Sequence, residues 1–232
     1  ETPDGFGFIV KAYQGMTGHA RGGVPYENTA AMFAAFRASI EPMRAAGKLL
    51  AVLFQYPPWF DCTRAHVDKL REARALMDGI PCALEFRNRS WLEDGMRDKT
   101  LAFMKREGWI HSVCDEPQAG EGSIPIVDEA TDPGLTLVRF HGRNAAGWNA
   151  GGPGWRDVRY LYRYAEAELK EWMQRLKRLE AQSGTVCVIF NNNSGGDAAD
   201  NALQLMRMLG GRPPRGGFDL PAEPEQMDLF EL

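Results

Sequence analysis

Six short apolar runs in this chain each end in a polar or charged residue, and each is followed by a turn and a helical pattern. The runs are Gly5-Lys11, Leu49-Gln55, Cys82-Arg87, Trp109-Asp115, Leu135-His141 and Val186-Asn191. Strands of a parallel sheet are nearly continuous hydrophobic stretches, because the connecting helices cover the sheet. Polar groups at the carboxyl ends of such strands predict a site at one mouth of a barrel or open sheet. The pattern therefore predicts an α/β enzyme scaffold.

Helical patterns separate most of these runs. Asn28 can cap a helix that ends near Gly47, and Thr63 can cap the next one. A weaker helix is expected around Leu101 and stops before Gly108. The clearest helix runs from about Tyr162 to Ala181, and the last covers Ala198 to Met208. From Arg212 onward Pro and Gly accumulate, so we expect residues 1–211 to form the barrel domain and residues 212–232 a flexible tail.

Length and charge limit the function classes. A chain of 232 residues with 44% hydrophobic content can bury the core of one α/β domain. The net charge of −4 excludes a general basic field, so any contact with nucleic acid needs a local patch. Cys62, Cys82, Cys114 and Cys187 contain no C-x-x-C pair and are read as reduced thiols. With no apolar run long enough to cross a bilayer, we expect a soluble cytoplasmic protein without a membrane partner.

The residues at the strand ends form the candidate site. Side chains alternate along a strand, so Glu85 and Arg87 share one face, as do Arg139 and His141. The other strand ends supply Lys11, Gln55, Asp115 and Asn191. Cations outnumber carboxylates in this set, and a partly buried excess of positive charge is costly without an anion. The set predicts a phosphate or carboxylate ligand, although Glu85 bridging Arg87 and Arg139 in a purely structural network explains the same residues.

The segment 191–197, with Asn191, Asn192 and two glycines before a helix, also favours an anion ligand. Small residues let backbone N–H groups approach a ligand, and the helix dipole favours negative charge. Arg143, after the preceding strand, would lie next to this segment. Tight turns of Asn and Gly also form for backbone reasons alone, so this alternative stays open.

Other chemistries find little support. Glu85, Asp115 and His141 are conceivable metal ligands, but the remaining histidines form no ligand motif, so we expect no metal and no evident cofactor. The chain has no P-loop, no dinucleotide-binding glycine motif and no serine-hydrolase elbow. Glu85 and Asp115 are the evident carboxylate pair for glycoside hydrolysis, but nearby cations would keep both ionised.

A series of motifs resembles the YecE-like family, also called domain of unknown function 72. They are Phe8-Ile-Val-Lys11, Thr17-Gly-His19, Leu53-Phe-Gln55-Tyr-Pro-Pro58, Leu84-Glu-Phe-Arg87, Ser90-Trp91, Cys114-Asp-Glu-Pro117, Val138-Arg-Phe-His-Gly-Arg-Asn144 and Phe190-Asn-Asn-Asn193. The resemblance implies a TIM-type β/α barrel whose activity is unassigned. The family's usual first two strand motifs are not found, so we expect a fragment with about six of the eight parallel strands.

These residues support two functional hypotheses. The first is an enzyme, a hydrolase or lyase, acting on a phosphate-bearing or otherwise anionic substrate. Glu85, His141 and Asp115 would be catalytic, with Glu85 or His141 moving protons. The substrate would be held by Lys11, His19, Gln55, Arg87, Arg139, Arg143, Asn191 and Asn192. The second is a non-catalytic adaptor that uses the same mouth to bind an anion or a nucleic-acid backbone.

The tail contains Gln226, Met227, Asp228, Leu229 and Phe230 after a Pro-rich, acidic stretch. This pentapeptide resembles the short Gln-Leu-Asp/Ser-Leu-Phe motif that docks bacterial DNA polymerases and repair proteins on the sliding clamp, with Met227 in place of the usual Leu. An extended tail can place Leu229 and Phe230 in a hydrophobic pocket while Gln226 makes a polar contact. A bacterial sliding clamp is therefore a candidate partner, and a tail folded back on the barrel is the alternative.

The clamp hypothesis predicts that a peptide of residues 221–232 binds a purified bacterial sliding clamp. The expected affinity is micromolar, about 8 kcal/mol, as measured by calorimetry. A peptide carrying both Leu229→Ala and Phe230→Ala should not bind. An intact peptide that shows no binding would exclude this partner.

Overall fold

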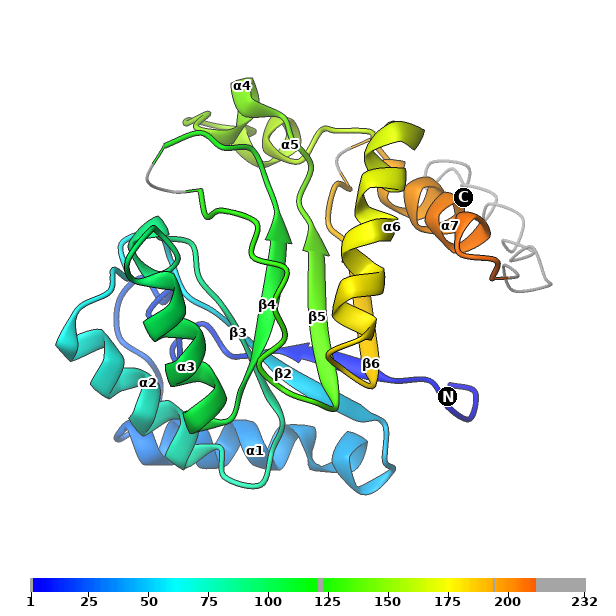
Figure 1. Ribbon diagram of the computed structural model, residues 1–232. Helices are drawn as coiled ribbons and strands as arrows, with labels where there is room; N and C mark the ends of the chain where they lie inside the picture. The colour runs from blue at the N-terminus through cyan, green and yellow to red at the C-terminus, as the bar shows by residue number, and fades with distance from the viewer. Residues whose placement is uncertain (1, 121–122, 194, 212–232) are drawn as a thin grey trace, which may run out of the picture.

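Six parallel strands form one curled half-barrel in a computed structural model that describes residues 2–120, 123–193 and 195–211 (Figure 1). The strands are β1 (Phe8–Lys11), β2 (Leu49–Gln55), β3 (Cys82–Glu85), β4 (Trp109–Asp115), β5 (Leu135–Phe140) and β6 (Thr185–Phe190), and they pair in chain order. This confirms the predicted TIM-type α/β fold with six parallel strands. β3, β5 and β6 end before Arg87, His141 and Asn191, so these residues lie just beyond the strand ends.

The connecting helices lie outside the curled sheet (Figure 1). The longer ones are α1 (Thr29–Ala45), α2 (Arg64–Leu76), α3 (Arg97–Glu107), α6 (Glu166–Glu180) and α7 (Asp197–Met208). Three short helices were not expected from the sequence: η1 (Arg89–Trp91), α4 (Ala145–Trp148) and α5 (Trp155–Arg159). α4 and α5 lie beyond the carboxyl ends of β4 and β5 (Figure 1). They bring additional residues to the mouth of the half-barrel.

The helix boundaries follow local hydrogen bonding. The Asn28 side chain accepts a bond of 2.9 Å from the Ala31 N–H, which confirms the predicted cap of α1. Thr63 stands at the cap position of α2, but its side chain makes no capping bond, so that part of the prediction is wrong. The helix predicted from Tyr162 begins only at Glu166. The backbone of Tyr164 is bound instead by the side chain of Asn201 on α7, which holds this stretch outside the helix.

Alternation along the strands separates two apolar layers. Ala51, Leu53, Ala83, Ile110, Leu135 and Leu137 form a cluster on the concave face of the sheet. The opposite face packs on the helices, where Leu169 and Trp172 of α6 are fully buried.

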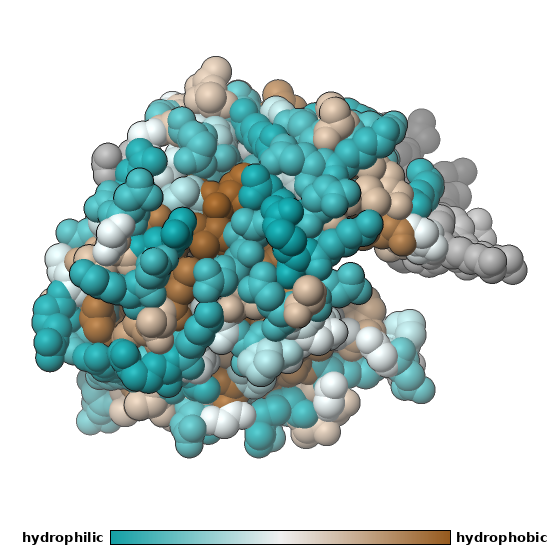
Figure 2. Space-filling view, in the orientation of Figure 1, coloured by the Kyte–Doolittle hydropathy of each residue, from teal (hydrophilic) through white to brown (hydrophobic). Residues whose placement is uncertain are grey.

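Polar side chains cover most of the face shown in Figure 2. None of the helices among the described residues is long and apolar enough to cross a membrane.

The concave face has a polar layer next to this apolar one, because residues two positions further along each strand lie on the same face. Gln55 and Glu85 follow Leu53 and Ala83 by two residues, and Arg139 follows Leu137. The strand register pairs Gln55 with Glu85 across β2 and β3, and Cys114 with Arg139 across β4 and β5. The polar residues therefore lie together above the apolar layer, at the carboxyl ends of the strands.

Candidate functional site

A buried ion network at the strand ends is built around Glu85. Its carboxylate accepts bonds of 2.9 Å from Arg87 Nε and 2.7 Å from Arg139 Nη1, and a longer one from the Ser112 hydroxyl. Glu85 has no exposed surface, and both arginines are buried. Burial alone would raise the pKa of Glu85, but Arg139 and Arg87 hold it well below its ordinary value. Glu85 is therefore an ionised bridge between two guanidinium groups.

Glu116 completes this network and was missed from the sequence. Its Oε2 accepts a bond of 2.7 Å from Arg87 Nη1, and its Oε1 accepts one of 2.7 Å from the Ile124 N–H. Burial raises the pKa of Glu116 to about 7, against the pull of Arg87. Glu116 follows Asp115 in the Cys114-Asp-Glu-Pro117 motif. The sequence gave no signal that Glu116, and not Asp115, would turn toward Arg87. When Glu116 is ionised, the two carboxylates balance the two arginines of the buried network.

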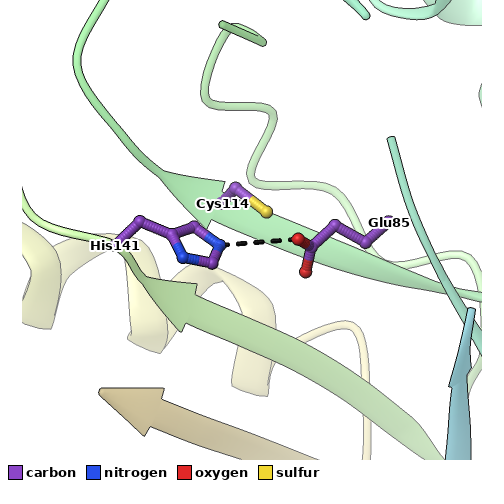
Figure 3. A group of neighbouring side chains, drawn as sticks. All are labelled: Glu85, Cys114 and His141. Carbon is purple, nitrogen blue, oxygen red and sulfur yellow. Dashed lines mark ion pairs between the residues drawn. The ribbon is translucent and has the colours of Figure 1, made fainter. Parts of the chain in front are cut away.

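His141 packs against the same network as a neutral ring. Its Nε2 points at Glu85 Oε1 across 3.5 Å (Figure 3). Its Nδ1 lies 3.1 Å from Asn191 Nδ2. Arg87 Nη2 is 2.9 Å from Nε2 and 3.4 Å from Nδ1. One nitrogen cannot lie along the lone pairs of both ring nitrogens, so this guanidinium stacks on the ring. Burial and Arg87 lower the pKa of His141 to about 3, which favours a neutral ring with its proton on Nε2.

An open cleft of about 1420 Å³ lies above the network. Of the residues predicted to bind substrate, Lys11, His19, Gln55, Arg87, Arg139 and Asn191 line it. Arg21, Trp59, Trp155, Asp157, Arg159 and Tyr160 also line it and were not foreseen, because their positions depend on loops and on α5. Five of the described lining side chains are Lys or Arg, whereas Asp157 is the one carboxylate among them. The cleft is therefore strongly basic.

Asp115 and Arg143 were expected in this mouth but lie on the other side of the sheet. Asp115 follows Cys114, so alternation turns its side chain toward α6. There it accepts a bond of 2.9 Å from Arg143 Nε and another from Trp172 Nε1. The two residues border a separate hollow with Glu171, and the expectation that they share the cleft is wrong. Their placement favours a role in holding α6 on the sheet.

Asn192 also lies away from the cleft. Its buried amide donates bonds of 2.9 Å to the Tyr162 carbonyl and 3.0 Å to Asn201 Oδ1, which tie this loop to α7. The first turn of α7 contains Asp197 and Asp200, and both pair with Arg163. These carboxylates already face the positive end of the helix dipole and would repel a further anion. The basic cleft is a better anion site than the start of α7.

The Glu85, Cys114 and His141 side chains point toward one another, with donor atoms within 4.8 Å (Figure 3). A cation held there would lie beside Arg87 and Arg139, which already occupy the Glu85 carboxylate. Burial also raises the pKa of the Cys114 thiol well above its ordinary value, which disfavours the thiolate that metals require. The surroundings of this group therefore do not favour a metal ion.

The fold and the site define an α/β half-barrel protein with a basic cleft at the carboxyl ends of its strands. The chain belongs to the DUF72 family, proteins of unknown function, whose family model matches residues 1–226. The sequence is 55% identical to UPF0759 protein YunF of Bacillus subtilis (strain 168), over 99% of this chain and 80% of that protein.

Solved structures of two DUF72 family proteins resemble this chain. A crystal structure of the protein from Enterococcus faecalis V583 matches with a TM-score of 0.87 and 37% identity, over 91% of this chain and 77% of that one. One from Thermotoga maritima MSB8 matches with a TM-score of 0.78 and 31% identity, over 90% of this chain and 75% of that one. The tail motif, Gln226 to Phe230, lies outside the described residues.

The pKa of Glu116 predicts a pH-dependent stability. A pKa raised from 4.5 to about 7 means that the folded protein keeps a proton that the unfolded chain releases in this range. Wild-type stability should therefore fall as pH rises through that window. Glu116→Gln removes this loss, so its unfolding free energy relative to wild type should increase by about 2 kcal/mol between about pH 5 and about pH 8.

Chemical denaturation across this pH range measures the difference. Glu180→Gln, at an exposed carboxylate at the end of α6, is the control and should follow the wild type throughout. If the difference between Glu116→Gln and wild type does not change with pH, Glu116 is ionised throughout and Arg87 outweighs burial.

Proposed function

We propose that this protein is an enzyme, a hydrolase or lyase, that acts on a phosphate-bearing or otherwise anionic small molecule bound in the cleft. The observation that carries the proposal is the charge of the cleft lining, five Lys or Arg side chains and His19 against Asp157. Two of these cations, Arg87 and Arg139, are balanced by the buried network. Arg21 and Arg159, which form no ion pair with a carboxylate of the described residues, make the cleft attractive to an anion.

Arg159 supports this reading most directly. Its guanidinium is half-buried and stacks over Trp148 at 4.2 Å from the ring centroid. Within the described part of the chain it forms no ion pair with a carboxylate. Burial and, more weakly, the nearby Arg87 lower its pKa, so its charged form is held at a cost. A bound anion would offset that cost.

Glu85 and His141 would act through the arginines. Both have no exposed surface, and neither lines the cleft, whereas Arg87, Arg139 and Asn191 do. Glu85 fixes both guanidinium groups, and His141 lies against Arg87 and Asn191. A guanidinium held in place before the substrate arrives loses little conformational freedom on binding it, which strengthens binding. We therefore assign Glu85 and His141 as positioning residues.

His19 is the best-placed group for proton transfer. It lines the cleft and is partly buried, with Nδ1 at 2.9 Å from Thr17 Oγ1. Burial, Lys11 and Arg87 lower its pKa, so its neutral form prevails at neutral pH. In a hydrolysis it would take a proton from water as the water oxygen bonds to the substrate's phosphorus or carbonyl carbon. The leaving group would then depart as the bond to it breaks.

A non-catalytic adaptor is the second candidate. Trp59, which is 56% exposed, and Trp155 and Tyr160 line the cleft beside the cations. Aromatic rings and basic side chains along one groove suit the bases and phosphates of a single strand of nucleic acid. The tail motif at Gln226 to Phe230 would bring such a module to the sliding clamp and so to DNA. Turnover of a small anionic substrate would favour the enzyme over the adaptor.

Anion binding predicts that inorganic phosphate raises the thermal stability of the protein, since a ligand selective for the folded state stabilises it by mass action. At about 100 times the dissociation constant, the gain should be about 2.7 kcal/mol. A double Arg21→Gln, Arg159→Gln variant should lose most of this gain in scanning calorimetry. Arg21 and Arg159 are chosen because removing Arg87 would leave Glu116 buried without its guanidinium, and removing Arg139 would take one of two guanidinium groups from Glu85. Breaking a buried pair in this way costs about 3–5 kcal/mol.

The control is Arg64→Gln, a change at a well-exposed arginine on α2 that lies outside the cleft lining. It should respond to phosphate like the wild type. A double variant that keeps the full response would show that phosphate binds elsewhere.

The role assignments predict different kinetic effects once a substrate is identified. His19→Asn should lower kcat by ~100-fold. In the wild type, activity should rise with pH as His19 loses its proton, at a pH below about 6.5 because the pKa of His19 is lowered. The variant should lack this rise. Glu85→Gln and His141→Asn should mainly raise KM, because they loosen the arginines. If a folded Glu85→Gln or His141→Asn protein loses kcat at unchanged KM, these residues transfer protons themselves, as the sequence hypothesis holds.

A further inference from the structure

A second, smaller pocket of about 200 Å³ adjoins the basic cleft. It lies between the loop that follows β1, the loop that follows β2, and helices α1 and α2. Its lining residues are Gly15, Met16, Thr17, Gly18, Thr29, Met32, Phe33, Tyr56, Trp59, Phe60, Lys69, Glu72 and Ala73. Gly18 and Trp59 also line the basic cleft, so the two cavities share a wall.

The chemistry of this pocket differs from that of the cleft. Met16, Met32, Phe33 and Phe60 are buried and give it an apolar wall. Its two charged residues, Lys69 and Glu72, come from exposed positions on α2. An apolar cavity of ~150 Å³ is large enough for a benzene ring. The pocket is therefore matched to a ring-sized apolar group, whereas the cleft is matched to a negative charge.

The shared wall is built so that one ligand can reach both cavities. Trp59 leaves 56% of its surface exposed, a large apolar area next to both cavities. Gly18 has a φ of +77°, and a Cβ there would lie 2.8 Å from Trp59 Cη2. A side chain at position 18 would displace Trp59, so both the backbone conformation and the packing require glycine. The exposed indole ring is thereby held against bare backbone at the junction.

We propose that the small pocket binds a ring-sized apolar group of the ligand whose anionic end occupies the basic cleft. The substrate class is then a phosphate ester, or a comparable anion, with one small aromatic or branched apolar substituent. The anionic half of this inference rests on the proposed function, whereas the apolar pocket stands on its own lining. Trp59 lies against the ligand between its two ends.

The pocket is tested first with phenol, a neutral probe that does not depend on the basic cleft. In protein with 13C-labelled methionine methyl groups, phenol should shift the signals of Met16 and Met32. The signal of Met206, exposed on α7, is the control and should not move. If Met16 and Met32 do not respond, the pocket does not accept a ring and the inference is wrong.

The link between the two cavities is tested with phenyl phosphate against inorganic phosphate. Phenyl phosphate should bind about 10-fold more tightly or better, the scale on which apolar pockets distinguish small groups. Ala73→Leu, which fills the pocket, should reduce its affinity to that of inorganic phosphate while leaving inorganic phosphate binding unchanged. Ala75→Leu, an exposed position on the same helix, should change neither affinity.

Equal affinities of the two phosphates for wild type, or an unchanged preference in folded Ala73→Leu, would overturn the inference. Thr29→Phe narrows the pocket from α1 and replaces Ala73→Leu if that variant does not fold. If phenol shifts Met16 and Met32 but neither phosphate binds, the proposed function fails while the apolar pocket remains.

Discussion

The structure of the candidate site depends on one buried carboxylate, Glu85, which pairs with Arg87 and Arg139. Removing these three charges from water is costly, and only their mutual hydrogen bonds offset the cost. The arrangement is possible because the strand register places β3 between β2 and β4, with β5 curling toward them. The closed ion network fixes the arginines at the base of the cleft.

The buried network and the cleft lining above it differ in their charge. Glu116 supplies the second buried carboxylate, so the network beneath the cleft is neutral when Glu116 is ionised. Further positive charge lies on Arg21 and Arg159 in the cleft lining, and neither forms an ion pair with a carboxylate of the described residues. The base of the cleft is thus a closed ion network, and the further positive charge lies on the cleft wall.

The half-barrel places its apolar core and its cleft lining on different parts of the chain, as is usual for β/α folds. Its strands and long helices form the apolar layers, and the loops after β1, β2 and β5 supply most of the cleft wall. The similarity to the solved DUF72 structures extends over about nine-tenths of this chain. Trp59 and Arg159 are examples of cleft-lining side chains that these connecting segments place.

The sequence by itself determined the order of strands and helices, because buried parallel strands and amphipathic helices have different periods. It also placed Glu85, Arg87 and Arg139 at one mouth, because residues two apart on a strand share a face. Only the tertiary structure decided which way Asp115 turns and that Glu116 pairs with Arg87, since both depend on the phase of β4 and on the loop that follows it. Arg159 and the apolar pocket likewise depend on loop paths, which are set by long-range packing and leave no periodic pattern in the sequence.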